Sequence, residues 1–453
     1  MVSDIPDQLI SRLSDFINLK IGLYFPENRW KELKRSMSAV ARDFAGKYDI
    51  ADDPVSCAEW LLSSPATQEQ LDILAKHLTI GETYFFRDKN LFQTLRQNIL
   101  PELIAGCRET GKKLRIWSAG CCTGEEPYSI AILADQMMPE RNITILATDL
   151  NTLFLRKAEQ GIYTRWSFRD TPEWIIQKYF IRTDEKYFEI SPYLKKMVRF
   201  SQLNLVDDIY PSVMNNTHAM DIIFCRNVLM YFESDQRAEI IGRFFRSLSE
   251  KGWLIFSPSE TPGVRHPGLA PVQFPNVTLY RKEVRGTGSE VRGQGSGGSS
   301  YWHAAGMPPP LISHLSPRTS DPVPAYETIL CLAGKGKLEE AEIQCKTAVE
   351  REKKLDPGYH YLLATIYQEQ GRPKDSLKSL RHALYLDPGF VLAHFLLGNL
   401  MMLEGRSDES EKHLRNALSL LLAMKPEALV AYSEGITAGR LLEVVQSMIQ
   451  RIL

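Results

Sequence analysis

Five short apolar runs, separated by segments of helix length, constrain the fold of this chain more than any other feature. The runs are Leu114–Ala119, Ile143–Thr148, Val198–Leu203, Asp221–Cys225 and Trp253–Ser257. Strands that are apolar along their whole length are covered on both faces, as in parallel sheets that have helices on each side. We therefore expect an α/β core with a doubly wound, mainly parallel sheet. Ligands of such sheets bind beyond the carboxyl ends of the strands.

The turn after the first of these strands is suited to a ligand. Gly120 and Gly124 allow the backbone to approach a ligand closely. Their spacing, G-x-x-x-G, differs from the G-x-G-x-x-G of dinucleotide sites. The carboxylates of Glu125 and Glu126 begin the next helix, where a pyrophosphate would need positive potential. We therefore expect a cationic or neutral ligand that carries hydroxyl and amino groups.

An aspartate ends the second strand. Asp149 follows Ala147 and Thr148, and an acidic residue at this place typically binds a ribose diol through two hydrogen bonds. The alternative is that Asp149 caps the next helix. Together with the glycine turn, it indicates an adenosyl ligand without a pyrophosphate. We interpret this ligand as S-adenosyl-L-methionine, bound by a Rossmann-like domain.

With 453 residues, the chain is long enough for two or three domains. We expect a helical N-terminal domain over residues 1–80, the sheet domain over 81–282 and another helical domain over 325–453. Residues 283–324 are rich in Gly, Ser and Pro and poor in aliphatic residues, so they cannot pack a core. We predict that they form a flexible linker.

The C-terminal part repeats. Equivalent small residues recur about every 35 positions, at Ala341, Ser376 and Ser410, which is the period of tetratricopeptide repeats. In the middle repeat Gly371 permits the turn between two helices and Pro388 follows the second helix. We predict an all-α repeat domain that binds a protein ligand, which the sequence does not identify.

The composition excludes several classes of protein. The net charge of −1 gives no overall field that would attract nucleic acid or an anionic membrane. The sequence has no apolar run of about 18 residues and no signal peptide, so we expect a cytoplasmic protein without direct membrane insertion. The seven cysteines are scattered, and His77 and His218 lie far apart without further ligands at metal-binding spacing. We predict no metal site.

Residues 1–282 resemble the CheR-type chemoreceptor protein-glutamate methyltransferases. Five motifs carry the resemblance, in order Thr83-Tyr-Phe-Phe-Arg87-Asp88, Ser118-Ala-Gly-Cys-Cys-Thr-Gly-Glu-Glu-Pro-Tyr-Ser129, Thr148-Asp149, Leu203-Asn204-Leu205 and Phe224-Cys-Arg226-Asn227-Val-Leu-Met-Tyr231-Phe232. The added repeats are similar to those of the Wsp-type branch, which acts in surface-associated signalling. The resemblance implies a methyltransferase domain with a small β insertion, S-adenosyl-L-methionine as methyl donor and S-adenosyl-L-homocysteine as product.

The resemblance also implies roles for individual residues. Thr83, Arg87 and Glu126 match residues at the methionine end of the methyl donor, and Asp149 matches the residue that binds the ribose. The matches on the adenine side and in the loop after the next strand are Asn204, Leu205, Arg226 and Asn227. Tyr231 matches a tyrosine near the transferred methyl group.

The chain departs from the family at two places. Gly81 stands where the family often has Asn, so one hydrogen bond to the methyl donor is in doubt. The segment 180–188 has no glycine, although relatives that dock a receptor's C-terminal peptide have a glycine-bearing loop there. We therefore do not expect this kind of docking.

The implied reaction needs no general base. A glutamate carboxylate, with an ordinary pKa of about 4.3, is already an anionic nucleophile at neutral pH. In-line placement of the two reactants can lower the barrier by about 7–11 kcal/mol. Arg87 and Tyr231 are our candidate catalytic residues for steering that carboxylate. A structural ion pair for Arg87 and core packing for Tyr231 are the alternatives.

A basic helix precedes the sheet domain. Apolar residues recur every three or four positions in Glu27–Phe44, which predicts an amphipathic helix. Its candidate substrate-binding side chains are Arg29, Lys34, Arg35 and Arg42. The alternative is an ordinary solvated face. The methylated helices of chemoreceptors are acidic, so the resemblance provides a partner for this surface, the cytoplasmic domain of a chemoreceptor-like protein.

Three functions remain to be compared. The first is methylation of glutamate side chains on a chemoreceptor-like signalling protein, in chemotaxis-type signal transduction. The second is a catalytically silent scaffold that senses the methyl donor and acts through its repeats, for which Gly81 is the hint. The third, a nicotinamide dehydrogenase, is opposed by the glycine spacing and by Glu125 and Glu126.

Overall fold

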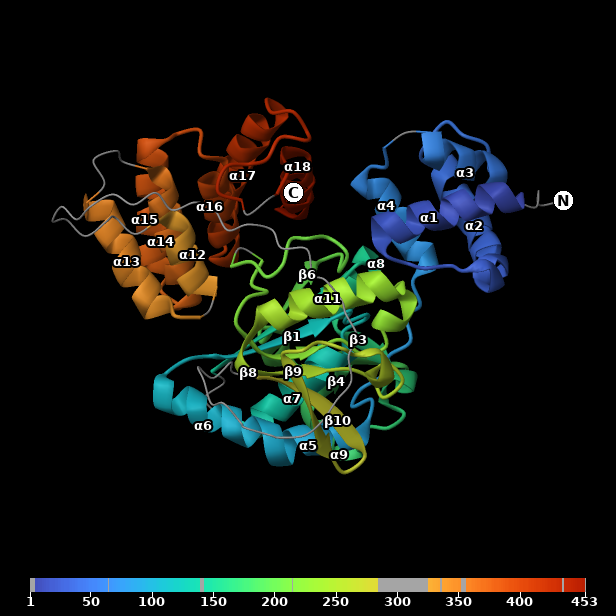
Figure 1. The fold of residues 1–453 in the computed structure, drawn as a ribbon, viewed down its shortest axis with the longest axis horizontal. Coiled ribbons are helices and arrows are strands. Elements are labelled where there is room, and N and C mark those ends of the chain that lie inside the picture. The colour runs from blue at the N-terminus through green and yellow to red at the C-terminus, as the bar shows by residue number, and fades with distance from the viewer. Residues whose placement is uncertain are drawn as a thin grey trace, which may run out of the picture.

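The structure is a computed structural model, and three parts of the chain fold around separate hydrophobic clusters. In Figure 1 the N-terminal helices and the C-terminal helices both lie above a central sheet domain. The residues that the structure describes are 5–63, 65–138, 142–213, 215–283, 325–334, 336–351, 356–433 and 436–452. The predicted linker lies outside them, apart from Glu283.

Four helices form the N-terminal part, α1 (Asp7–Ile21), α2 (Trp30–Ala45), α3 (Pro54–Ser63) and α4 (Gln68–Leu78). The predicted periodicity of α2 is confirmed, because Leu33, Met37, Val40 and Phe44 are fully buried against the other helices. Its basic residues are left on the outer surface, as expected for an amphipathic helix.

The central sheet has seven strands in the order β6-β2-β1-β7-β8-β10-β9. Their bounds are β1 Leu114–Ala119, β2 Ile143–Asp149, β6 Val198–Gln202, β7 Met220–Phe224, β8 Leu248–Ile255, β9 Leu269–Phe274 and β10 Val277–Lys282. The first five in this order are parallel, while β10 pairs antiparallel with β8 and β9. The predicted doubly wound, mainly parallel sheet is therefore confirmed.

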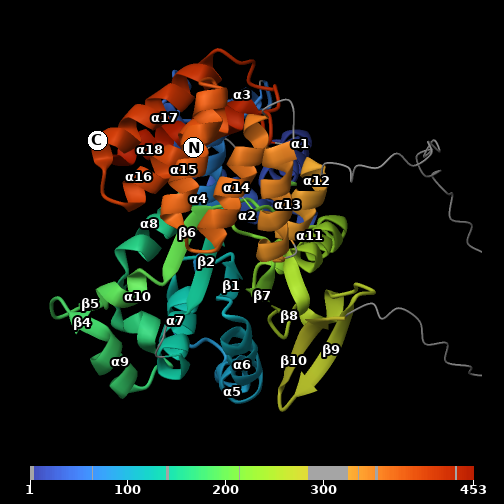
Figure 2. The ribbon, with the colours of Figure 1, turned by 90° about the vertical axis from the view of Figure 1, so that its left-hand side faces the viewer.

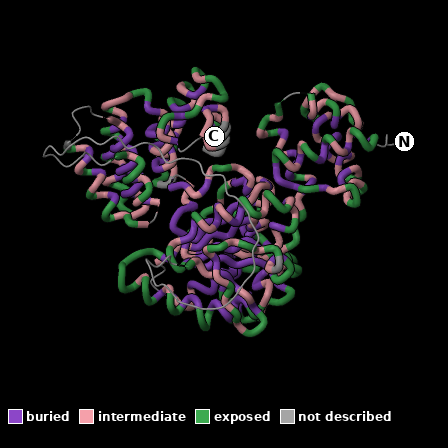
Figure 3. The backbone as a smooth tube through the Cα atoms, in the orientation of Figure 1, coloured by how far each residue is buried: buried purple, intermediate pink, exposed green. Residues whose placement is uncertain are grey.

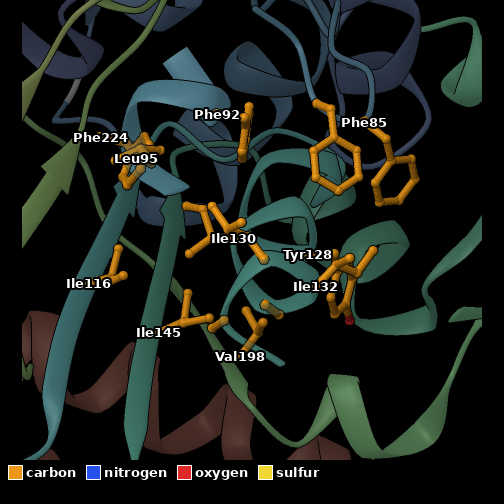
Figure 4. Close-up of a cluster of buried hydrophobic side chains, with 14 of the residues drawn as sticks. Phe85, Phe92, Leu95, Ile116, Tyr128, Ile130, Ile132, Ile145, Val198 and Phe224 are labelled. Atoms are coloured by element: carbon orange, nitrogen blue, oxygen red, sulfur yellow. The ribbon is translucent and has the colours of Figure 1, made fainter. Parts of the chain in front are cut away.

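Successive side chains of the central strands pack into hydrophobic clusters on opposite faces of the sheet. Ile116 and Ile145 belong to one cluster, whereas the next residues, Trp117 and Leu146, belong to the cluster on the opposite face. This follows from the two-residue period of a strand and explains why apolar residues stand side by side in the chain, as in Ile116-Trp117 and Ile145-Leu146. Figure 4 shows the first cluster, where Ile130 and Tyr128 of α7 (Glu125–Met137) lie over the sheet.

The remaining helices of this domain cover the sheet on both faces (Figure 2). They are α5 Lys89–Thr94, α6 Leu100–Thr110, α8 Thr152–Gln160 and α11 Ser234–Ser247. The small β insertion implied by the family resemblance is present as a three-stranded antiparallel sheet of order β3-β5-β4. Its elements are β3 Ile162–Thr164, α9 Glu173–Tyr179, β4 Phe180–Arg182, β5 Tyr187–Ile190 and α10 Pro192–Lys195.

The C-terminal part consists of stacked helical hairpins. The helices are α12 Tyr326–Gly334, α13 Leu338–Arg351, α14 Pro357–Glu369, α15 Pro373–Leu386, α16 Val391–Leu403, α17 Ser407–Leu422 and α18 Ala438–Ile452. Ala341, Ser376 and Ser410 are fully buried, because small side chains let the paired helices approach. Gly371 ends its hairpin turn with a left-handed φ of 71°, as the repeat pattern predicts.

Buried residues are concentrated in the centre of the sheet domain and alternate with exposed ones along each helical part, as the tube in Figure 3 shows. No helix in the parts that the structure describes is long and apolar enough to cross a membrane.

Candidate active site

A cleft opens at the carboxyl ends of β1, β2, β6 and β7, at the edge of the sheet where the strand pattern predicts a ligand. It has a volume of about 1040 Å³ when the open space at its mouth is counted. Its walls come from six parts of the chain, represented by Leu23 after α1, Thr83 before α5, Gly120 after β1, Asp149 at the end of β2, Leu205 after β6 and Asn227 after β7. The loops after the strands are far apart in the sequence but meet here, because the carboxyl ends of parallel strands lie at one edge of the sheet.

The predicted glycine turn lies on the floor of the cleft. Gly120 has a left-handed φ of 79°, and a Cβ atom there would lie 2.4 Å from a methyl group of Val228. Any larger residue at position 120 would therefore displace the loop after β7. Gly124 has a φ of 93° and immediately precedes α7, so the helix begins at Glu125 as predicted.

Asp149 ties this turn to the second strand. Its carboxylate oxygens accept backbone N–H groups from Cys122 at 2.8 Å and from Asn151 at 2.9 Å. Burial raises the pKa of Asp149 to about 6, although the hydrogen bonds from these amides act in the opposite direction. Asn151, not Asp149, caps α8, because its side chain accepts the N–H groups of Leu153 and Phe154. The capping alternative for Asp149 is therefore wrong.

Two acidic and one basic side chain meet on another wall. Arg226 is 4% exposed and lies 3.2 Å from Glu126 and 3.7 Å from Asp88. The second oxygen of Glu126 accepts a hydrogen bond of 2.7 Å from Ser118. In the described part of the chain, the Nε–H of Arg226 is buried and has no hydrogen-bond partner. Such a donor is costly to leave unpaired, so this wall fits a ligand that supplies an acceptor.

The chemistry of the cleft fits S-adenosyl-L-methionine. The carboxylates of Glu126 and Asp149 suit positively charged and hydroxyl groups, while Arg226 offers an unpaired donor to a carboxylate. Apolar side chains of Ile21, Leu23 and Phe232 line the same cleft and suit an adenine ring.

The two candidate catalytic residues line this cleft together. Arg87 donates a hydrogen bond of 2.9 Å to the carbonyl oxygen of Glu82. Its neighbours Phe86 and Asp88 have left-handed backbones, with φ of 56° and 76°, a conformation that L-residues with side chains rarely adopt. Burial raises the pKa of Tyr231, against the effect of the nearby Arg29 and Arg87 charges. The phenol is therefore a hydrogen-bond donor at neutral pH.

All but one of the residues predicted to bind the methyl donor or to steer the substrate carboxylate line the cleft. The lining includes Thr83, Arg87, Gly120, Glu126, Asp149, Asn204, Leu205, Arg226, Asn227 and Tyr231. Gly81 is not among the lining residues. A Cβ atom on Gly81 would lie 2.7 Å from the ring of Phe154, so close packing against α8 accounts for the glycine.

The basic residues of the N-terminal part lie outside the cleft. Arg29 pairs with Glu32 at 2.9 Å, and Lys34 pairs with Asp7 at 3.2 Å. Arg35 and Arg42 are exposed on α2. The charge of Arg29 nevertheless acts on Tyr231, which connects one end of this surface with the cleft.

The histidines and cysteines do not form a metal site in the part of the chain that the structure covers. His77 pairs with Asp43 at 2.8 Å, whereas His218 lies 3.8 Å from Glu369. Cys121 is fully packed and Cys122 half-buried in the glycine turn, and burial raises the pKa of both thiols. Both cysteines therefore act as small residues of the turn.

Sequence reasoning missed Glu260, which organises the loop after β7. Its carboxylate accepts the backbone N–H groups of Asn227 at 2.8 Å, Val228 at 2.8 Å and Met230 at 3.3 Å, and also binds Ser257. Asn227 has a left-handed φ of 59°, and these bonds hold it in place. The sequence did offer a signal for Glu260, because this acidic residue follows β8 and so lies at the edge of the sheet where ligands bind.

We predict that Glu260→Gln loosens this loop. An amide side chain offers one acceptor oxygen in place of two, so buried N–H groups lose partners at a cost of about 1–3 kcal/mol. Hydrogen exchange at Asn227 and Val228 should become at least about tenfold faster, since about 1.4 kcal/mol corresponds to a factor of ten. The exposed Glu250→Gln is the matched control, and equal exchange in the two variants would contradict the prediction.

Comparisons with known proteins also indicate a site for S-adenosyl-L-methionine. Residues 81–268 match the family described as CheR methyltransferase, SAM binding domain, and residues 357–390 match the tetratricopeptide repeat. A chemotaxis protein methyltransferase of Borreliella burgdorferi is 36% identical over 197 residues, covering 42% of this chain and 68% of the relative. Chemotaxis protein methyltransferase 2 of Vibrio cholerae is 30% identical over 295 residues, covering 63% of this chain and 96% of the relative.

A further relative matches a larger share of the chain. The probable biofilm formation methyltransferase WspC of Pseudomonas aeruginosa is 28% identical over 341 residues, covering 70% of this chain and 79% of that protein. Among solved structures, the Yersinia enterocolitica chaperone SycD with a YopD peptide is 21% identical, with a TM-score of 0.25 over 28% of this chain and 88% of that one. That likeness is too weak to argue from. The chain belongs to the family of chemotaxis protein methyltransferases and is an S-adenosylmethionine-dependent enzyme with C-terminal tetratricopeptide repeats.

Proposed function

We propose that this enzyme methylates glutamate side chains in the cytoplasmic domain of a chemoreceptor-like signalling protein. The products are glutamyl methyl esters and S-adenosyl-L-homocysteine. The observation that supports this most strongly is the cleft itself, where Arg87 and Tyr231 line the same walls as the groups that fit the methyl donor. A cytoplasmic location follows from this substrate.

S-adenosyl-L-methionine, when bound, supplies a methyl group on a positively charged sulfur. The chain's own residues then have to hold a substrate carboxylate in line with that group, without removing a proton. Arg87 offers a charge and Tyr231 a neutral O–H donor for this purpose. We infer that they steer the carboxylate while leaving its attacking oxygen free.

We propose the following division of the cleft. Thr83, Arg87, Glu126 and Arg226 hold the methionine end, where the unpaired N–H of Arg226 lies. Asp149 binds the ribose diol, since its carboxylate lines the cleft beyond β2. The adenine side is assigned to Asn204, Leu205 and Asn227, with the backbone of Gly120 as the floor.

Methyl transfer should depend on Arg87. We expect label from methyl-labelled S-adenosyl-L-methionine to enter candidate receptor domains and to be released as methanol by mild alkali. Arg87→Ala should lower the rate by about 100-fold or more, because misplacement of the reacting groups by about 1 Å has that effect. Arg96→Ala, an exposed arginine of the same domain, serves as the control. Tight binding of the methyl donor without transfer to any receptor would favour the silent-scaffold alternative.

Binding of S-adenosyl-L-homocysteine should weaken in mild acid. The pKa of Asp149 is raised to about 6, so the carboxylate that accepts two ribose hydroxyl groups is protonated below that pH. If only the ionised form binds well, Kd should be about tenfold higher at about pH 5 than at about pH 7. Titration calorimetry on the full chain would measure this. Asp149→Asn should bind weakly and without that slope, and an equal slope in both proteins would contradict the assignment.

The basic face of α2 is our proposed contact with the receptor. Arg35→Glu with Arg42→Glu should lower kcat/KM for the receptor by on the order of tenfold, since like charges then face its acidic helices. The effect should shrink at high salt, and affinity for the methyl donor should stay unchanged. Arg156→Glu with Lys157→Glu on α8 makes the same change of charge elsewhere. Equal losses in the two double variants would refute a specific contact.

A further inference from the structure

The first two repeats make a polar contact with the sheet domain at the end of the sheet remote from the cleft. Glu369, the last residue of α14, forms an ion pair with Arg115 near the start of β1. The two side chains are 8% and 16% exposed, so the pair is largely removed from water. This contact is distinct from the cleft and from the predicted linker.

Further groups of the sheet domain surround the same carboxylate. His218 lies 3.8 Å from Glu369 and is 2% exposed. Asn216, with its amide turned to satisfy both neighbours, donates to Glu369 and accepts a hydrogen bond of 2.9 Å from Arg199 on β6. Burial lowers the pKa of Arg199 while the charge of Glu369 raises it, so the two side chains interact electrostatically. Two arginines therefore converge on one carboxylate from the repeats.

A neutral histidine and a second carboxylate complete the enclosure. Burial and the nearby Arg115 lower the pKa of His218 to about 4, so this imidazole is uncharged at neutral pH. Asp221, the other carboxylate near Arg115, accepts the backbone N–H of Arg115 and the hydroxyl of Ser249. Loss of Glu369 would therefore leave the Arg115 guanidinium buried without its carboxylate partner, which is costly in a low-dielectric site.

Apolar and close backbone contacts lie beside the ion pair. Val213 of the sheet domain is buried in the hydrophobic cluster of the repeats, together with Ile329 and Leu362. The Nζ of Lys112 donates to the carbonyl oxygen of Gly336 at 3.2 Å. A Cβ atom on Gly336 would lie 3.2 Å from that of Ala219. The turns of both the first and the second repeat thus touch the sheet domain.

This contact lies at the far end of the strands from the cleft. Arg115 stands near the amino end of β1, whereas Gly120 follows its carboxyl end. A strand of six residues spans about 20 Å. In Figure 1 the repeats lie over one end of the sheet domain and the N-terminal helices over the other.

We propose that Glu369 docks the repeats onto the amino ends of the sheet strands in a fixed orientation, so that a protein bound by the repeats is held at a fixed place relative to the cleft without covering it. The repeats are then a rigid part of the enzyme rather than a freely tethered domain. The proposal concerns the arrangement of the chain and does not depend on which protein is methylated.

Hydrogen exchange on the full chain tests the docking. In the unaltered protein, backbone amides of 112–115 and 215–219 should be protected to the same degree as the sheet. Glu369→Arg, which places a third positive charge between Arg115 and Arg199, should raise exchange in these segments and in 330–337 of the repeats by at least about tenfold. Small-angle X-ray scattering should show a larger radius of gyration.

Matched variants separate docking from misfolding. Glu404→Gln is the control, because Glu404 follows the first helix of the next repeat and pairs with Arg406 on the surface. Arg115→Met removes the charge from the other side and should give the same pattern as Glu369→Arg, which keeps the test valid if one variant misfolds. Affinity for S-adenosyl-L-homocysteine should change less than about twofold in all of them.

Three results would overturn the proposal. One is rapid exchange of 215–219 in the unaltered protein. Another is an effect of Glu369→Arg confined to the repeats, with the sheet-domain segments unchanged. The last is a marked loss of affinity for S-adenosyl-L-homocysteine in a folded Glu369→Arg protein, which would show that the contact acts on the cleft.

Discussion

The cleft depends on carboxylates whose partners are backbone amides. Asp149 binds the N–H groups of Cys122 and Asn151, and Glu260 binds those of Asn227 and Val228. Each carboxylate fixes a loop that follows a parallel strand, and hydrogen bonds to ionised groups are stronger than those between neutral groups. The walls of the cleft therefore keep their shape although they come from distant parts of the chain.

The charges of the cleft complement the charges of the methyl donor. Glu126 is held by Ser118 and Arg226, while one N–H of Arg226 remains without a partner in the described structure. A zwitterionic amino acid group and a sulfonium need both signs of charge within one small volume. No proton has to be removed from a glutamate substrate, so the cleft needs placement of the reactants rather than a general base.

Local patterns predicted the elements well. The apolar runs predicted β1, β2, β6 and β7 to within a residue or two, because strands that are buried on both faces are rich in apolar residues. The start of β8 was missed, since Leu248–Gly252 includes polar residues and a shift of register against β7. The repeat period predicted the helical hairpins, whose small residues are fully buried.

The candidate site was predicted through its motifs, but its assembly was not. Glu260 was missed because its role lies in accepting backbone amides more than 25 residues away, and no local pattern records such a partner. Gly81 was interpreted by comparison with the family, whereas in the structure the ring of Phe154 leaves no room for a side chain at this position. Leu23 of the N-terminal part lines the cleft only because the helical domain packs over the sheet edge.

The sequence by itself determined the sheet, the glycine turn, the repeats and the class of ligand, because each depends on residues close together in the chain. Tertiary structure alone decided which loops meet in the cleft, and which residues of the repeats face the sheet domain. The partners of Glu260 and Glu369 are separated by many residues, and burial away from water gives these contacts their strength. Proximity in space and exclusion of water arise only when the whole chain has folded.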